Sequence, residues 1–290
     1  MSWRTVVISS SSKLDYQLGY LVVRKTDVVK IYLSEIYMLM IESTSVSLTA
    51  TLLCELMKRK IKVVFCDEKR NPCSELIPYY GAHDTSNKIR KQIAWSNDIK
   101  KEIWTEIVKE KIFNQQMLLY KLGLNEAELL KKYRSEIKLG DVTNREGHAA
   151  KVYFNALFGK QFTRNDENSI NAALNYGYSL ILSSFNREIV ANGYITQLAL
   201  FHDNMFNPFN LASDIMEPFR PLVDELVVDM NLQKFEHEEK MKLVSLLQHE
   251  VVINGRTETV CNAIKIYCRS IFEALNDNNS LLIKWFENEL

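Results

Sequence analysis

Two hydrophobic patterns divide the chain. From residue 3 to about residue 72, short apolar runs alternate with polar breaks, which is typical of strands. These runs are TVVIS, YQLGYLVVR, VVKIYL and KVVFC. One helix is expected over residues 45–60, because apolar residues recur there at helical spacing. The pattern predicts a small sheet with a helix covering one end of it.

The hydrophobic pattern changes from strand-like to helical after Cys66. The segment DEKRNPCSELIPYYGAHD contains Pro72, Pro78 and Gly81, which favour turns over the interior of an element. Beyond it, helices are expected over residues 89–122, 125–139, 145–158, 166–191, 194–201, 211–226, 237–247 and 257–275. We therefore predict a two-domain α+β fold. A small N-terminal β-sheet domain (1–80) is joined by a linker at about 72–87 to a larger all-helical C-terminal domain (88–290).

Composition narrows the class of protein. With 290 residues, 47% of them hydrophobic, the chain can bury a proper core. It has no apolar run of about 18 residues and no secretory leader pattern, so neither a membrane span nor export is expected. Its five cysteines are odd in number and form no CxxC pair, which argues against a disulfide framework or a zinc site. A cytoplasmic protein is expected.

Net charge says little about partners. The 36 basic and 36 acidic residues balance, so a nucleic-acid footprint has to come from local clusters. Basic clusters occur at residues 58–60, 88–91, 100–101 and 131–134. Each taken alone is typical of a solvated helix face. Only as a group do they point to DNA.

Glu146 has two interpretations. It follows Thr143 by three residues, the capping-box pattern in which the glutamate only satisfies a helix N-terminus. Alternatively, it is a functional carboxylate at a helix start, a position that attracts anions. Possible phosphate contacts lie beside it at Asn144, Arg145 and Lys151.

His202 ends the apolar segment GYITQLALFH, just before the turn-rich DNMFNPFN. The pattern predicts a helix ending at this histidine. His202 either caps the last carbonyls of that helix or belongs to a site.

A second acidic group follows. Asp214 and Glu217 are three residues apart and are expected on one helical face, where they repel unless a cation lies between them. Arg220 can supply a purely structural ion pair to Glu217. Pro218 is expected to start or kink the helix.

Taken in order, NREGHAAKVYF and FHDNMFNPFNLASDIMEPFRPLVD resemble the CRISPR-associated integrase family that inserts new spacers, the first of the CRISPR-associated proteins. The resemblance extends to SWRTVVIS, NPCSELIPYYGAHD and NSINAALNYGYSL, so it covers essentially the whole chain. It is closest to the type II-A branch.

The resemblance implies a set of site residues. Glu146, His202 and Glu217 would be the catalytic metal ligands, and Asp214 would be either a ligand or a group behind them. Arg220 would face DNA phosphate beside the metal. Oxygen ligands with one imidazole suit Mg²⁺ or Mn²⁺ better than Zn²⁺.

The resemblance also implies a function: a metal-dependent DNA endonuclease and integrase. It would insert short foreign DNA into the CRISPR array by 3′-hydroxyl transesterification, during the adaptation stage of antiviral defence. Family members act as homodimers, two of which are bridged by the second CRISPR-associated protein into a heterohexamer. In type II-A systems the RNA-guided nuclease and a DNA-end-binding ring protein also take part. The alternatives are a non-catalytic DNA-binding scaffold and a structure-specific DNA repair nuclease.

Overall fold

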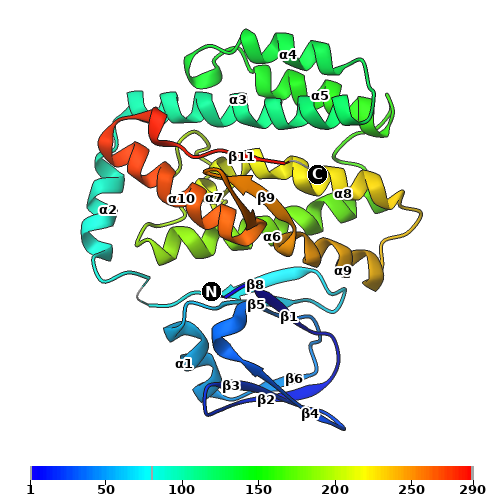
Figure 1. The fold of residues 1–290 in the computed structure, drawn as a ribbon, viewed down its shortest axis with the longest axis vertical. Coiled ribbons are helices and arrows are strands. Elements are labelled where there is room, and N and C mark those ends of the chain that lie inside the picture. The colour runs from blue at the N-terminus through cyan, green and yellow to red at the C-terminus, as the bar shows by residue number, and fades with distance from the viewer. Residues whose placement is uncertain (1, 80, 289–290) are drawn as a thin grey trace.

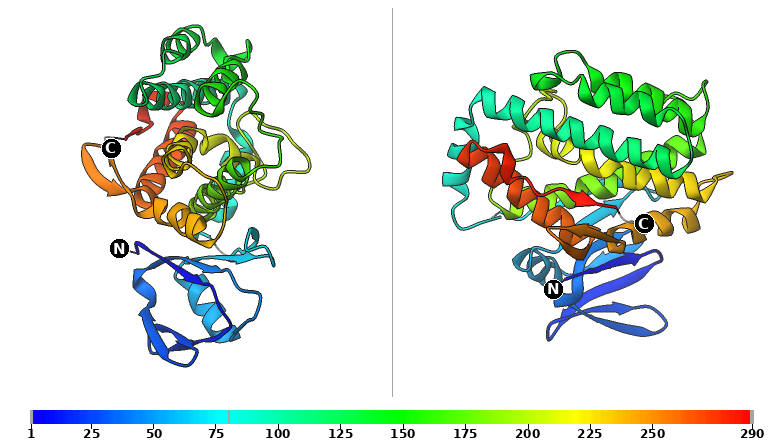
Figure 2. Two further views of the ribbon diagram at one scale, coloured as in Figure 1. Left: turned by 90° about the vertical axis from the view of Figure 1, so that its right-hand side faces the viewer. Right: turned by 45° about the horizontal axis from the view of Figure 1, so that its top comes forward.

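The computed structural model describes residues 2–79 and 81–288, and places strands β1 to β8 in one region and most of the helices in another (Figure 1). The N-terminal sheets form one end of the molecule, and α3 (Asn97–Lys121), α4 (Ala127–Ser135) and α5 (Arg145–Phe158) form the other (Figure 2). The predicted α+β class, with a β-sheet part followed by a helical part, is confirmed. Within the described residues, no helix is long and apolar enough to cross a membrane.

Two four-stranded sheets make the N-terminal part. One has the order β1-β5-β7-β8, with β8 antiparallel to β7 and the other pairs parallel; the second has the order β4-β3-β2-β6. Their bounds are β1 Arg4–Ile8, β2 Ser12–Gln17, β3 Tyr20–Arg24, β4 Val28–Tyr32, β5 Ile36–Ile41, β6 Val46–Leu48, β7 Lys62–Cys66 and β8 Pro72–Leu76, with η1 at Leu33–Glu35. The single helix α1 (Ala50–Lys58) begins at Thr49, whose side chain accepts the Leu52 amide.

β5 is buried on both faces. Leu39 packs into the core between the two sheets, whereas Met38 and Met40 pack into the core of the helical part. A strand buried on both sides carries a continuous apolar run without alternation. β5 is absent from the predicted strands because its residues do not alternate between apolar and polar. β8 is absent too: it lies inside the segment expected to be turns and linker, and it continues the first sheet beyond β7.

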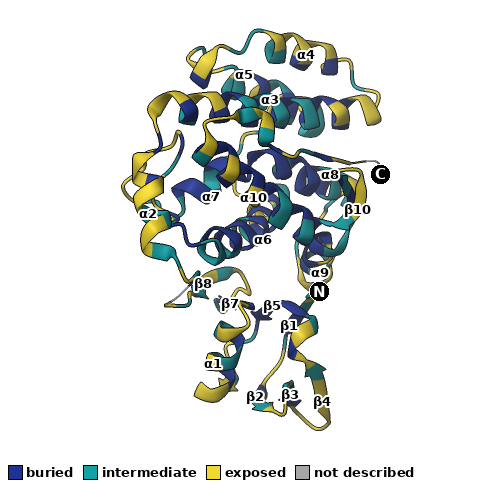
Figure 3. Cartoon of the chain, turned by 60° about the vertical axis from the view of Figure 1, so that its left-hand side comes forward, coloured by how far each residue is buried: buried dark blue, intermediate teal, exposed yellow. Residues whose placement is uncertain are grey.

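The helical part contains α2 (Thr85–Ala94), α3, α4, α5, α6 (Ser169–Ala191), α7 (Asn210–Ile215), α8 (Arg220–Met230), α9 (His237–Ser245) and α10 (Val260–Asp277). Short 3-10 turns occur at η2 Leu139–Asp141, η3 Glu217–Phe219, η4 Leu246–Gln248 and η5 Ser280–Leu282. α6, α7 and α10 are mostly buried, while the outer faces of α2 and α4 are exposed (Figure 3).

The helical part is not all-helical as predicted. A three-stranded sheet of order β10-β9-β11 is formed by Glu250–Ile253 (β9), Arg256–Thr259 (β10) and Phe286–Glu287 (β11). Residues 257–259, expected at the start of a helix, belong to β10. The long helix expected over 89–122 is two helices, because the Ser96 side chain accepts the Ile99 amide and begins α3 anew.

The helix predicted over residues 194–201 is wrong: this segment is a loop. Two buried side chains form hydrogen bonds with its backbone groups instead. The Gln92 side chain accepts a hydrogen bond from the Ile195 N–H and donates to the carbonyls of Ile195 and Leu198. The Asp214 carboxylate accepts hydrogen bonds from the Leu200 and Phe201 amides. These bonds replace the helical pattern and fix the loop in place.

Candidate functional site

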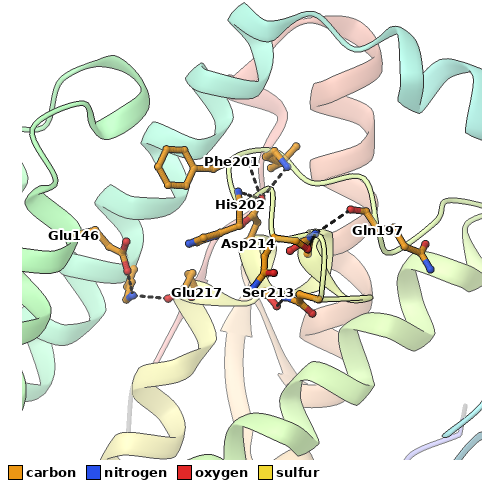
Figure 4. Close-up of polar contacts among 12 residues, drawn as sticks. Glu146, Gln197, Phe201, His202, Ser213, Asp214 and Glu217 are labelled. Atoms are coloured by element: carbon orange, nitrogen blue, oxygen red, sulfur yellow. Dashed lines mark hydrogen bonds and ion pairs between the residues drawn. The ribbon is translucent and has the colours of Figure 1, made fainter. Parts of the chain in front are cut away.

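Three segments far apart in the sequence meet on α3. They are the start of α5, the loop ending at His202, and the α7–η3–α8 corner (Figure 4). On α3, Trp104 contacts the loop, Lys111 contacts α5 and η3, and the Asn114 side chain donates to the Pro218 carbonyl at 3.0 Å. The helix therefore serves as the common support of the site.

The N-terminus of α5 is capped by two residues, neither of them predicted. The Asp141 carboxylate accepts the Arg145 amide at 2.8 Å and the Glu146 amide at 2.9 Å. Asn144, in the left-handed region at φ 50°, accepts the Gly147 amide at 3.2 Å. A Cβ at Gly147 would stand 2.7 Å from Asn144 Oδ1, so glycine leaves room for this cap.

The capping-box interpretation of Thr143 and Glu146 is therefore wrong. The Thr143 hydroxyl is buried without a hydrogen-bond partner, and Asp141 already satisfies the first amides of the helix. This leaves the Glu146 carboxylate free to point across to α3.

Glu146 and Glu217 converge on one cation. The Lys111 ammonium lies 2.5 Å from Glu146 Oε1 and 2.5 Å from Glu217 Oε2. Burial disfavours the charged ammonium, but the two carboxylates outweigh it and raise the pKa of Lys111. A lysine from a distant helix thus relieves the repulsion between Glu146 and Glu217.

Arg220 provides the predicted ion pair. Its Nε donates to Glu217 Oε1 at 2.9 Å, and its guanidinium lies 4.6 Å from the centre of the Tyr178 ring. Burial alone would raise the pKa of Glu217, but Arg220 and Lys111 outweigh that effect and lower it. The chain turns at Pro218 in η3, as the sequence analysis predicted.

Asp214 does not share a helical face with Glu217, because α7 ends between them. Its fully buried carboxylate accepts the Leu200 and Phe201 amides, each at 2.8 Å, and lies 2.5 Å from His202 Nδ1. The hydrogen bond with Asp214 is the main reason that the pKa of His202 is raised. Asp214 therefore orients both the loop and the imidazole.

Trp104 is a site residue that the sequence analysis missed. Its ring stacks on Phe201 at 4.6 Å between centroids and meets the edge of His202 at 5.4 Å. His202 consequently lies between a carboxylate and an indole, with 44% of its side chain exposed. The predicted role as a cap at a helix end does not apply, because no helix ends there.

The phosphate contacts predicted beside Glu146, at Asn144, Arg145 and Lys151, remain predictions. Asn144 is the cap of α5, and Arg145 pairs with Glu136 at 2.9 Å. Lys151 is exposed on α5.

The donor set suits a cation that prefers oxygen. Two carboxylates already face one cation, Glu217 Oε2 is buried without a hydrogen bond of good geometry, and an imidazole held by a carboxylate stands nearby. In the arrangement observed, no three His, Cys, Asp or Glu side chains among the described residues are close enough together to hold a metal ion. The ammonium of Lys111 lies where the two glutamates meet.

Comparison with known proteins finds relatives that span most of the chain. The family model described as CRISPR associated protein Cas1 matches residues 5–250. The CRISPR-associated endonuclease Cas1 of Neisseria meningitidis serogroup C (strain 8013) is 34% identical, over 98% of this chain and 96% of that protein.

Solved structures share the fold. A casposase bound to integration product has a TM-score of 0.76 at 17% identity, covering 96% of this chain and 92% of its own. A Cas6-RT-Cas1–Cas2 complex has a TM-score of 0.74 at 19% identity, covering 97% of this chain and 36% of that chain. With its family model and its curated relative both spanning most of its length, the chain belongs to the Cas1 family of CRISPR-associated endonucleases.

Proposed function

We propose that this protein is a metal-dependent DNA endonuclease and integrase that inserts short foreign DNA into a CRISPR array. The observation that carries the proposal is the convergence of Glu146 and Glu217, each 2.5 Å from one ammonium nitrogen, beside His202. Membership of the Cas1 family and the fold shared with a casposase bound to integration product support it.

The cation would be Mg²⁺ or Mn²⁺, held by Glu146, Glu217 and His202. When bound, it supplies Lewis-acid chemistry at the scissile phosphate. Because Asp214 engages Nδ1 of His202, the other ring nitrogen is the one left for the metal, an arrangement common in metalloproteins. Asp214 is thus a group behind the ligands. Arg220, anchored on Glu217 and partly exposed, would face the DNA phosphate.

The reaction exchanges one phosphodiester for another. The incoming DNA 3′ oxygen forms a bond to phosphorus and gives up its proton, while the bond to the leaving 3′ oxygen breaks and that oxygen takes up a proton. Water in place of the 3′-hydroxyl gives strand cleavage instead. Glu146 and Glu217 would hold the metal and Arg220 would bind the phosphate, so that the attacking and leaving oxygens lie in line.

Partners follow from the family. The fold shared with the Cas6-RT-Cas1–Cas2 complex supports Cas2 as a partner. The family resemblance adds a homodimer of this chain, bridged by Cas2 into a heterohexamer. The resemblance to the type II-A branch adds the RNA-guided nuclease and the DNA-end-binding ring protein to the proposal, along with the prespacer and the CRISPR repeat as DNA partners.

The test is strand transfer of a 3′-hydroxyl duplex into a repeat-containing plasmid, with and without Cas2. Glu146→Gln and His202→Ala should each abolish transfer in Mg²⁺ or Mn²⁺, while Glu128→Gln, on exposed α4, should leave it intact. Transfer by either site variant at the parent rate would refute the assignment. DNA binding without any metal-dependent nicking would indicate a scaffold. Cleavage of branched DNA without Cas2, and no transfer, would indicate a repair nuclease.

A further inference from the structure

Lys111 lies where the proposed function places a divalent cation. Its nitrogen is 2.5 Å from an oxygen of Glu146 and 2.5 Å from an oxygen of Glu217. Oxygen ligands bind Mg²⁺ at about 2.1 Å, so the two carboxylates are already gathered to within a few tenths of an ångström of metal distances. An ammonium of single charge thus stands between the two glutamates.

The position of Lys111 on α3 is unusual for a lysine. It is 7% exposed, on the same buried face as Trp104 and Val108. Lysine is almost never fully buried unless it is paired, and the two glutamates pair it here. Lys109, two residues earlier, pairs with Glu106 at the surface of the same helix with 40% of its side chain exposed. The burial of Lys111 is therefore specific to the site.

We infer that Lys111 is a positioning residue that acts as an internal cation in the metal-free protein. It holds Glu146 and Glu217 together, and its ammonium must move aside before a divalent ion can bind between them. The inference rests on the proposed function, because it takes the two glutamates as metal ligands. An ammonium and a divalent ion repel each other and cannot share one position.

The displaced ammonium has to find another anion. Its flexible four-carbon stem allows such a movement, and a DNA phosphate at the site is an anion of suitable charge. Metal binding is consequently coupled to DNA binding: the metal-free protein resists the ion, and DNA that accepts the ammonium removes that resistance.

Metal affinity is the first test. Mn²⁺ is titrated into the full-length protein freed of metal, and free Mn²⁺ is followed by electron paramagnetic resonance. Lys111→Met should bind Mn²⁺ at least about tenfold more tightly than the parent protein, because the competing charge is gone. Lys111→Gln should also bind Mn²⁺ more tightly than the parent protein, and Lys109→Met on the same helix should bind it as the parent does. If both Lys111 variants bind Mn²⁺ no more tightly than the parent, the Lys111 ammonium does not compete with the metal ion.

The same titration separates the inference from the proposed function. Absence of Mn²⁺ binding by both Lys111→Met and the parent would overturn the metal site itself, and the competition with it. Equal, measurable binding by the two proteins would overturn the competition and leave the metal site standing.

Thermal unfolding in EDTA is the second test, independent of metal. Lys111→Met should lower the melting temperature, since Glu146 and Glu217 then face each other unpaired. Adding Glu146→Gln to Lys111→Met should recover part of that loss by removing one of the two charges. If the single and double variants melt at the same temperature, Lys111 does not hold the glutamates together.

Discussion

His202 Nδ1 lies 2.5 Å from Asp214 Oδ1, and the other oxygen of Asp214 accepts the amides of the two residues that precede the histidine. One buried carboxylate therefore fixes both the imidazole and the backbone that carries it. Because the acceptor is charged and fully buried, its bonds are stronger than neutral ones, and their loss is costly.

Asp214→Asn should loosen this loop. An amide offers one acceptor oxygen, and its NH₂ faces either the loop amides or His202, so one set of bonds is lost. We expect the free energy of unfolding to fall by about 2 kcal/mol and metal affinity by about 10- to 100-fold. Denaturant unfolding measures the first effect and Mn²⁺ titration the second, while amide hydrogen exchange at Leu200 and Phe201 reports how far the loop is loosened.

Asp203→Asn is the matched control, since Asp203 is exposed and adjacent to His202. It should change neither stability nor exchange. Parent-like exchange at Leu200 in Asp214→Asn would show that the carboxylate does not hold the loop.

The sequence allowed the fold class to be predicted, but not the strands that lack alternation. β1, β3, β4 and β7 stand out as β-rich runs, whereas most of β2 is polar and falls in a break between the predicted strands. β5 has both faces buried, and its continuous apolar run does not distinguish a strand from a buried helix. The hairpin of β9 and β10 did carry a signal: Asn254 and Gly255, both at positive φ, are the favoured pair for a two-residue turn. β11 joins that sheet through long-range pairing, which local pattern does not encode.

The site was predictable only in part. Glu146, His202 and Glu217 lie in segments that resemble a family motif, so the resemblance could name them. Lys111 and Trp104 lie in a long helix without such a motif. Their role depends on which face of α3 meets α5 and the His202 loop. The available hint was a lysine on the same helical face as buried apolar residues, a position that requires a charged partner.

Asp141 should matter to the site through its cap. In Asp141→Ala the amides of Arg145 and Glu146 lose their acceptor, and alanine is strained at φ 47°. The expected loss is about 1–2 kcal/mol of unfolding free energy. Strand transfer should fall as well, because Glu146 lies in the first turn of α5.

Asp141→Asn separates the two causes, because asparagine tolerates the left-handed region and keeps one acceptor oxygen. It should lose clearly less stability than Asp141→Ala in the same denaturant experiment. Equal losses would contradict a contribution from backbone strain and the remaining bond.

Gly177 allows α6 to approach α8 closely. A Cβ there would stand 2.4 Å from Cγ1 of Val223, so Gly177→Ala overpacks the contact. Alanine favours a helix over glycine by about 1 kcal/mol, yet overpacking costs about 1–3 kcal/mol. We expect a net loss of stability in thermal unfolding. Val223→Ala added to Gly177→Ala should recover stability, and purely additive effects of the two changes would contradict this packing.

Asp224 should make stability depend on pH. Its buried carboxylate accepts hydrogen bonds from the hydroxyls of Tyr153 and Tyr178, which join α5 and α6 to α8. Burial raises the pKa of Asp224 from 3.8 to about 6, while the tyrosine hydroxyls oppose the shift. The folded protein therefore keeps a proton on Asp224 at pH values where the unfolded chain has released it.

The sign follows from linkage. The contribution of Asp224 to stability is fully present below pH 3.8, falls as pH rises toward about 6, and is level above that. The fall is on the order of 2–3 kcal/mol in total.

Asp224→Asn carries no charge at this position and should lack this pH-dependent contribution to stability. The difference in unfolding free energy between the parent and Asp224→Asn, measured in urea from acid to neutral pH, should therefore decrease as pH rises. Asp229→Asn, exposed on the same helix, should give no such change. A pH-independent difference for Asp224→Asn would mean that the pKa of Asp224 is the same in the folded and the unfolded protein.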